Sequence, residues 1–126
     1  MNKKISIILS TYNEAYIIDE KIKKILTNIE NVEIVIVDDN SSDGTCDIID
    51  KINNPKIKLF RRSGRGLSSA FLLGLINSTG EIVGWFDSNM PELIDKVPVM
   101  LESLETNDLV ILSRFIEGGE DTRSKL

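Results

Sequence analysis

The chain has 126 residues, of which 41% are hydrophobic and 28% are charged, as in an ordinary globular domain. Its net charge of −5 argues against a general nucleic-acid-binding protein, because such proteins carry a basic stripe that contacts phosphates. It has no histidine and one cysteine, Cys46, which excludes Ser-His and Cys-His dyads, histidine bases and a disulfide framework.

No apolar run approaches the roughly 20 residues that a membrane-spanning helix needs. The apolar stretch near the N-terminus ends at Ser10, which is short for the core of a signal peptide and suits a first strand. We therefore expect a cytoplasmic chain that forms one domain over residues 1–126.

Apolar runs of strand length alternate along the chain with segments of helical spacing. Strands are expected at Ile5–Leu9, Glu33–Val37, Lys56–Phe60, Glu81–Phe86 and Asp108–Leu112. Helices are expected at Glu14–Ile29, Asp43–Ile52, Gly66–Asn77 and Pro91–Leu104, the last with a kink at Pro98. The alternation predicts an α/β fold with a central, mostly parallel sheet and right-handed crossovers. Lysines alternate with apolar residues in Lys56–Phe60, which favours a place near the sheet edge, whereas Trp85 is expected in the core.

Polar side chains follow the strands at the ends where open α/β sheets bind their ligands. These sets are Tyr12-Asn13-Glu14, Asp38-Asp39, Asp87-Ser88-Asn89 and Ser113-Arg114. Because unpaired buried charge is very costly, we expect Asp38 and Asp39 to meet a ligand, a metal ion or a helix N-terminus. The alternative is that this acidic pair only shapes the turn and that Asp43 or Ser42 caps the next helix.

Five motifs resemble those of family 2 glycosyltransferases, in the same order and with similar spacing. They are STYNEA at 10–15, IVIVDDNSSDGT at 34–45, GLSSAFLLG at 66–74, STGEIVGWFDSN at 78–89 and LVILSRFIEGG at 109–119. The resemblance is greatest to the polyprenol-phosphate branch, which includes dolichyl-phosphate mannosyltransferases, and it covers nearly the whole chain.

The resemblance implies a GT-A, Rossmann-like fold and an inverting transfer from a nucleotide diphosphate sugar, either GDP-mannose or a UDP-hexose. A lipid phosphate such as a polyprenyl phosphate is the implied acceptor, and no oligomeric state is indicated. The implied substrate-binding residues are Ser10, Tyr12, Glu14, Val37, Asp39 and Ser88. By the same resemblance Asp87 and Asn89 hold a Mg or Mn ion, and Asp87 and Arg114 are the catalytic residues.

The chemistry of such a transfer agrees with these residue types. A departing nucleotide diphosphate gains negative charge, which a hard cation on oxygen ligands offsets. An anionic phosphate acceptor needs no strong base, and an arginine can position it through paired donors. The absence of histidine is compatible with this mechanism.

The chain also departs from the family pattern. Asn89 stands where the family has its second metal-binding aspartate, which predicts a lower metal affinity because an amide oxygen carries no charge. The segment that follows, Met90-Pro91-Glu92, is shorter than its counterpart in the family. Catalytic members of this branch are longer, so the resemblance implies that the C-terminal acceptor and membrane-associated part is missing, and the expected location extends to the cytoplasmic face of a membrane.

Two alternatives remain open at this point. One is a catalytically silent nucleotide-binding relative of the same family. The other is a receiver-like signalling domain, since such domains also carry an acidic pair after a strand and a further aspartate, here Asp87, later in the chain. The arginine-rich loop at Arg61–Gly66 is equally consistent with a phosphate cradle at a helix start and with a solvated loop.

Overall fold

The structure, a computed structural model, describes residues 3–64, 66–86, 91–113 and 117–119. The chain divides into two compact units, residues 1–95 and 96–126. Asp87, Ser88, Asn89 and Arg114 lie outside the described residues.

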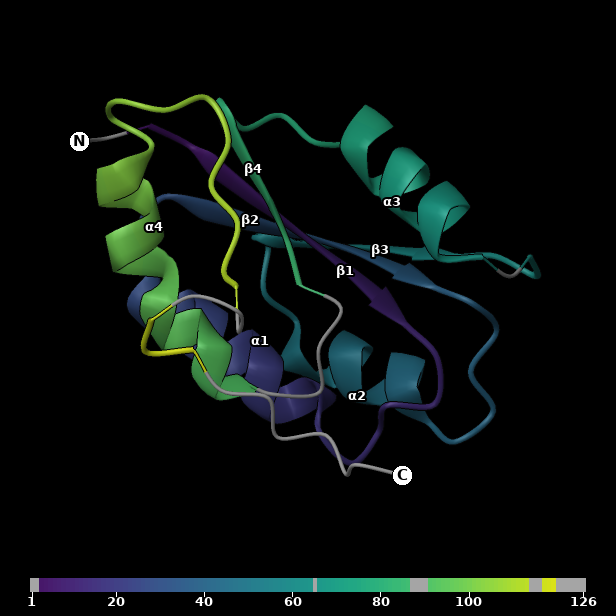
Figure 1. Ribbon diagram of the computed structural model, residues 1–126. Coiled ribbons are helices and arrows are strands. Elements are labelled where there is room, and N and C mark those ends of the chain that lie inside the picture. The colour runs from purple at the N-terminus through teal and green to yellow at the C-terminus, as the bar shows by residue number, and fades with distance from the viewer. Residues whose placement is uncertain (1–2, 65, 87–90, 114–116, 120–126) are drawn as a thin grey trace, which may run out of the picture. The chain divides into compact units, whose positions relative to one another are not determined.

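The first unit contains a four-stranded parallel sheet with the order β3-β2-β1-β4 (Figure 1). Its strands are β1 (Ile5–Thr11), β2 (Val32–Asp38), β3 (Ile57–Arg61) and β4 (Ile82–Trp85). β1 and β2 pair residue by residue from Ile5 and Val32 to Thr11 and Asp38. The two central strands therefore end at the same edge of the sheet, and the polar residues that follow them meet there.

Three helices connect these strands: α1 (Ile18–Asn28), α2 (Thr45–Ile52) and α3 (Leu67–Ile76). Figure 1 shows α1 and α2 on one face of the sheet and α3 on the other. Strands covered on both faces have continuous apolar sequences. Accordingly, every residue of β2 is buried, and Ile34, Val35, Ile36 and Val37 have no exposed surface. The predicted α/β fold with a mostly parallel sheet is confirmed.

The order of the strands distinguishes a Rossmann-like sheet from the sheet of a receiver domain. Receiver domains have the order 2-1-3-4-5, in which the third strand lies beside the first. Here β3 pairs with β2, as in the 3-2-1-4 half of a Rossmann sheet. The sheet therefore does not have the topology of the receiver-like alternative.

Both outer strands of the sheet are partly exposed. β3 is half-buried along most of its length, which confirms the edge position predicted from its lysines. The prediction that Trp85 lies in the core is wrong, since 41% of this residue is exposed. Trp85 belongs to the outer strand β4, whose burial alternates because successive side chains point to opposite faces and the face with Val83 and Trp85 is the less covered. The ring of Trp85 lies 4.9 Å from that of Phe71 in α3.

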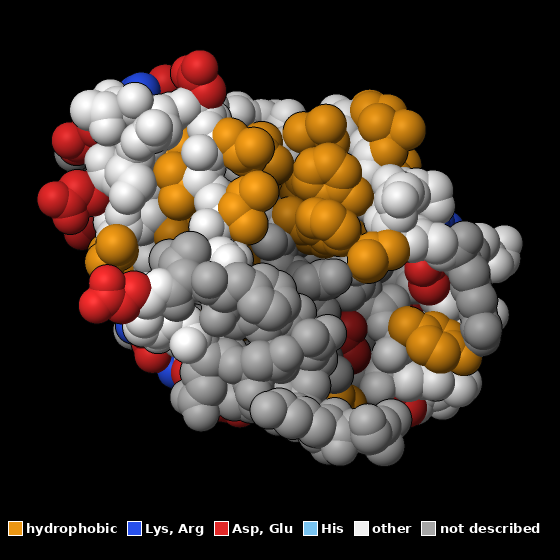
Figure 2. Space-filling view, viewed as in Figure 1, with side chains coloured by type: hydrophobic (Ala, Val, Ile, Leu, Met, Phe, Trp, Pro, Cys, Tyr) orange, Lys and Arg blue, Asp and Glu red, His pale blue; other side chains and the backbone are white. Residues whose placement is uncertain are grey.

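An exposed apolar surface covers α3 and the neighbouring β4. Figure 2 shows hydrophobic side chains gathered over these two elements. The large apolar residues exposed on them are Leu67, Leu72, Leu75, Ile76, Val83 and Trp85.

The helix predicted over Pro91–Leu104 is divided into a 3₁₀ helix, η1 (Pro91–Lys96), and an α-helix, α4 (Val97–Ser103). Pro98 has no N–H to donate to the carbonyl of Ile94, so a continuous α-helix would lose a hydrogen bond at the predicted kink. The strand predicted at Asp108–Leu112 is wrong: these residues are irregular, and Leu109 and Ile111 are 75% and 74% exposed. An apolar run becomes a strand only beside a partner, and none pairs with 108–112 among the described residues.

Within the described part of the chain, no helix has the length and apolar character required to cross a bilayer.

Candidate functional site

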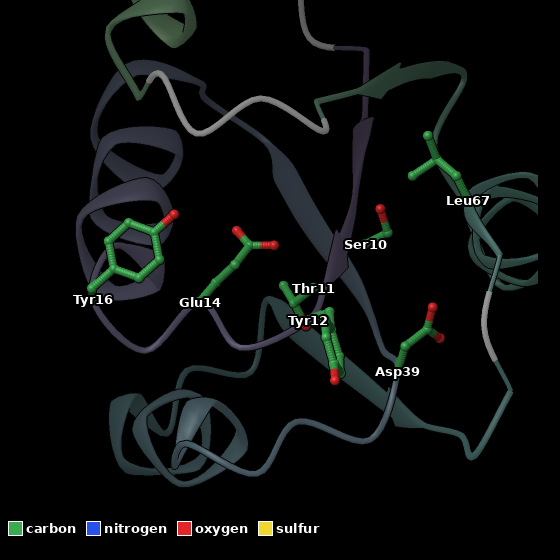
Figure 3. Close-up of a pocket in the computed structure, with 7 residues that line it drawn as sticks. All are labelled: Ser10, Thr11, Tyr12, Glu14, Tyr16, Asp39 and Leu67. Carbon is green, nitrogen blue, oxygen red and sulfur yellow. The ribbon is translucent and has the colours of Figure 1, made fainter.

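An open pocket of about 300 Å³ lies where β1 and β2 end (Figure 3). It is lined by Ser10, Thr11, Tyr12, Glu14, Tyr16, Asp39 and Leu67. These residues come from the end of β1, the loops after β1 and β2, and the start of α3. The volume falls at the lower end of the range for small-molecule sites, and the position is the one where open α/β sheets bind ligands.

Hydrogen bonds between the loop after β1 and the loop after β2 hold the pocket residues that follow β1 in place. The Asn13 amide donates to Ser41 Oγ at 2.8 Å, and the Ser42 amide donates to Asn13 Oδ1 at 2.9 Å. The Glu14 amide donates to Thr45 Oγ1 at 3.0 Å, at the start of α2. Asn13 has a left-handed backbone with φ of 50°, a conformation that asparagine adopts more readily than most residues. The chain can therefore turn between Tyr12 and Glu14 so that both line the pocket.

These contacts also explain why α1 starts at Ile18 and not at the predicted Glu14. The amides of Ile17 and Ile18 both donate to the carbonyl of Glu14, at 3.0 and 2.9 Å, in a turn that precedes the helix. The residues before Ile18 are thus used for the pocket loop.

The two aspartates after β2 have different roles. Asp38 is 1% exposed and accepts hydrogen bonds from Thr11 Oγ1 at 2.7 Å and from the Ser41 amide at 2.8 Å. Burial alone would raise the pKa of Asp38, but hydrogen bonds from Ser41, Thr11 and Cys46 hold it below its ordinary value. Asp38 therefore shapes the turn, as in the alternative interpretation of the acidic pair, while Asp39 reaches the pocket.

Asp43 fastens the start of α2. Its carboxylate accepts hydrogen bonds from the amide of Thr45 at 3.1 Å and from the amide of Ala15 at 3.0 Å. These bonds, with the one from the Thr45 hydroxyl as the largest contribution, lower the pKa of Asp43. The N-cap position of α2 is Gly44, without a side-chain cap hydrogen bond, so Asp43 binds the first helical amide from one residue before the cap.

Each pocket carboxylate is paired with a cation that does not line the pocket. Lys21 Nζ lies 2.9 Å from Glu14 Oε1, and the lysine side chain is only 1% exposed. Arg62 Nε lies 2.5 Å from Asp39 Oδ1, and both side chains are largely buried. The pairing keeps two acids close to a binding site without an uncompensated buried charge.

The sequence analysis predicted neither of these pairings, although it noted the arginine-rich loop to which Arg62 belongs. Lys21 follows Ile18 by three residues and precedes Ile22, so helical spacing places it on the buried face of α1, where a lysine requires an acidic partner. For Arg62 the sequence offered no such signal, because its partner Asp39 is 23 residues away. Thr11, Tyr16 and Leu67 also line the pocket without having been predicted.

The structure brings together four of the residues that the resemblance implied: Ser10, Tyr12, Glu14 and Asp39. Val37 lies in β2 with its side chain fully buried, and it does not line this pocket. The remaining implied residues, Asp87, Ser88, Asn89 and Arg114, are outside the described ranges.

No group of three or more acidic, histidine or cysteine residues able to hold a metal ion occurs in the part of the chain that the structure describes. Glu14 and Asp39 are each engaged by a cation, which makes them poor metal ligands. Asp87 and Asn89 carry the oxygen donors that Mg and Mn prefer, so the type of donor fits although their positions are not described.

Comparisons with known proteins agree with the resemblance found in the sequence. The family model described as glycosyl transferase family 2 matches residues 6–126. The chain is 31% identical over 122 residues to a dolichol-phosphate mannosyltransferase of Pyrococcus furiosus, covering 93% of this chain and 35% of that protein. It is 28% identical to an undecaprenyl-phosphate mannosyltransferase of Micrococcus luteus, covering 90% of this chain and 49% of that protein. The chain thus spans between a third and a half of the length of these relatives.

A similar structure is that of the mannosyltransferase PcManGT from Pyrobaculum calidifontis in complex with GDP-Man and Mn²⁺. It matches with a TM-score of 0.60 and 32% identity over 66% of this chain and 26% of that one. Together with the parallel sheet, this match confirms the predicted GT-A architecture.

Proposed function

Because the chain belongs to glycosyl transferase family 2, we propose that its pocket binds the nucleotide of a nucleotide diphosphate sugar, such as GDP-mannose or a UDP-hexose. We propose further that residues 1–126 form the donor-binding domain of an inverting enzyme that glycosylates a polyprenyl phosphate or a similar lipid phosphate. The observation that carries the proposal is the meeting of Tyr12, Glu14 and Asp39 in one pocket at the carboxyl edge of the sheet.

The pocket offers groups that match a nucleoside. Ionised carboxylates accept hydrogen bonds, so Glu14 and Asp39 suit ribose hydroxyls and the N–H groups of a base. Tyr12 and Tyr16, which are 46% and 71% exposed, present aromatic rings on which a base can stack.

The paired cations make the same pocket tolerant of a diphosphate. Two unpaired carboxylates would repel an anionic ligand over distances of several ångströms. Lys21 and Arg62 compensate both charges, so Glu14 and Asp39 can bind the nucleoside without excluding the diphosphate attached to it.

In the proposed reaction an oxygen of the acceptor phosphate attacks the anomeric carbon and the nucleoside diphosphate leaves from the opposite side. When bound at Asp87 and Asn89, a Mg or Mn ion supplies positive charge that stabilises the leaving diphosphate. Arg114 orients the acceptor phosphate through its paired N–H donors. A lipid phosphate acceptor would place the protein at a membrane surface, and we propose the cytoplasmic face.

The test is isothermal titration calorimetry of the full chain with UDP and GDP in the presence of Mn. We expect the wild-type chain to bind at least one nucleotide and Asp39→Ala to lose this binding, since it removes the carboxylate at the pocket wall. Asp47→Ala, at an exposed position of α2, is the matched control and should bind like the wild type. If Asp39→Ala bound nucleotide as tightly as the wild type, the pocket would be wrongly assigned.

A second measurement separates an enzyme from the silent-relative alternative. Transfer of sugar from a radiolabelled GDP-mannose or UDP-hexose to a polyprenyl phosphate supports the enzyme. Nucleotide binding without any such transfer supports a chain that only binds the donor.

A further inference from the structure

Arg62 makes more contacts than a simple counter-ion of Asp39 would need. It follows directly after β3, and its side chain is 19% exposed. Its Nε donates to Asp39 Oδ1 at 2.5 Å and its Nη2 to Asp39 Oδ2 at 3.3 Å. A planar guanidinium matched to both oxygens of a carboxylate fixes the rotation of that carboxylate as well as its charge.

The same guanidinium also holds the start of α3. Its Nη2 donates to the carbonyl of Gly66 at 2.7 Å, and its Nη1 donates to Ser69 Oγ at 2.8 Å. Gly66 immediately precedes Leu67, which lines the pocket. Arg62 therefore connects two pocket walls that come from different elements, Asp39 after β2 and Leu67 at the start of α3. Figure 3 shows the side chains of Asp39 and Leu67 in the pocket.

Arg62 leaves Asp39 able to bind a ligand. An ionised carboxylate offers about four lone-pair positions, and the two contacts from Arg62 use about half of them. The remaining positions stay available to N–H or O–H donors of a molecule in the pocket. Without Arg62, the largely buried Asp39 would lose its compensating charge and would be driven to turn toward solvent.

We infer that Arg62 is a positioning residue of the nucleotide pocket: it holds the Asp39 carboxylate in its binding orientation and fixes its separation from Leu67. This inference rests on the proposed function, since the molecule that Asp39 would recognise is a nucleotide. The residue acts through Asp39 and does not itself line the pocket.

The test compares nucleotide affinity by calorimetry, with UDP or GDP and Mn, among Arg62→Gln, Arg62→Lys, Ser68→Ala and the wild type. We expect Arg62→Gln to bind about tenfold more weakly, the effect of one charge-assisted hydrogen bond. Arg62→Lys keeps the positive charge but cannot donate two parallel hydrogen bonds to one carboxylate. Its nucleotide affinity should lie between those of Arg62→Gln and the wild type. Ser68→Ala, at an exposed position of α3 that does not contact Arg62 in the hydrogen bonds above, is the control and should remain within about twofold of the wild type.

A double-mutant cycle separates positioning from general stabilisation. Asp39→Asn alone should weaken binding, and adding Arg62→Gln to it should cause no further loss, because Arg62 acts through the carboxylate. Circular dichroism and thermal unfolding show whether each variant is folded. If Arg62→Gln does not fold, the cycle is measured with Arg62→Lys in its place.

Distinct outcomes overturn the inference and the proposed function. If the wild type bound nucleotide and the folded Arg62 variants bound it equally well, or if the losses from Asp39→Asn and Arg62→Gln were additive, the positioning role would be wrong while the proposed function would stand. If the wild type bound neither UDP nor GDP, the proposed function would fail, and the inference with it.

Discussion

Glu33 is a buried carboxylate near the start of the central strand β2, at the end of the sheet opposite the pocket. It contacts residues at or just before the beginnings of the other three strands. Its Oε1 accepts hydrogen bonds from Ser6 Oγ and from the Thr79 amide, both at 2.5 Å. Its Oε2 lies 3.0 Å from Lys58 Nζ and 3.4 Å from Lys4 Nζ. Burial acts to raise the pKa of Glu33, but the hydrogen bonds from Ser6, Thr79 and Lys58 together hold it far below its ordinary value of 4.5.

This arrangement predicts a pH-dependent stability. Since the pKa of Glu33 is lower in the folded chain than in the unfolded chain, its contribution is complete above about pH 4.5 and is lost as the pH falls below that value. Glu33→Gln should lower the free energy of unfolding at pH 7 by about 1–3 kcal/mol, because it leaves buried donors and lysines poorly paired. The difference between the two proteins should shrink as the pH is lowered.

Urea unfolding of both proteins between pH 3 and pH 7 measures this difference. Other carboxylates with lowered pKa values, such as Asp38, are common to both proteins, so their contributions cancel. A difference that stayed constant with pH would show that Glu33 does not titrate in the folded state as described.

At the scale of the elements, α3 and β1 approach each other closely at Gly74. A Cβ atom placed on Gly74 would lie 2.5 Å from Ile8 Cγ2, a distance that real Cβ atoms essentially never show. Ile8 is fully buried in β1, so it has little room to move away. The absence of a side chain at residue 74 therefore sets how near α3 lies to the sheet.

Overfilling a packed core costs about 1–3 kcal/mol. Alanine is favoured over glycine in a helix by about 1 kcal/mol, so Gly74→Ala should destabilise the protein by the remainder, up to about 2 kcal/mol. Ser68→Ala, at an exposed position of the same helix, is the control and should change stability by less than about 0.5 kcal/mol. Equal midpoints of urea unfolding for Gly74→Ala and the wild type would contradict this close contact.

At the scale of the whole molecule, a net charge of −5 opposes the binding of a nucleotide diphosphate. A divalent cation between protein and diphosphate removes this repulsion, and its affinity depends on the number of carboxylate ligands. Asn89 contributes an uncharged oxygen where the family has an aspartate, so we expect Mn to bind weakly and only together with a nucleotide.

Asn89→Asp should tighten Mn binding on the order of tenfold, because it restores a negatively charged oxygen ligand. Asp87→Ala should abolish it, since Asp87 is the principal carboxylate of the segment. Paramagnetic broadening by Mn, measured with UDP or GDP present, follows both variants. If neither variant changed the affinity for Mn, this segment would not hold the metal. The interpretation as a catalytically silent relative would then be better supported than that as an enzyme.

The sequence by itself determined the strands and helices of the first unit and the edge of the sheet at which polar residues gather. These features depend on local patterns: Ile34–Val37 is continuously apolar because β2 is covered on both faces, and Asp39 follows it directly. The family could also be predicted from the sequence, because its motifs are short segments that occur in a fixed order.

Only the tertiary structure decided that β4 is an outer strand, as β3 was predicted to be, and which charges compensate each other. Trp85 is exposed because its face of β4, an outer strand among the described residues, is incompletely covered. Asp108–Leu112 forms no strand because it has no partner in the same part of the chain. Arg62 reaches Asp39 across 23 residues of sequence because β3 pairs with β2, which brings the ends of these two strands together. Strand order and charge pairing are long-range properties that follow from how the whole sheet assembles, and no local pattern contains them.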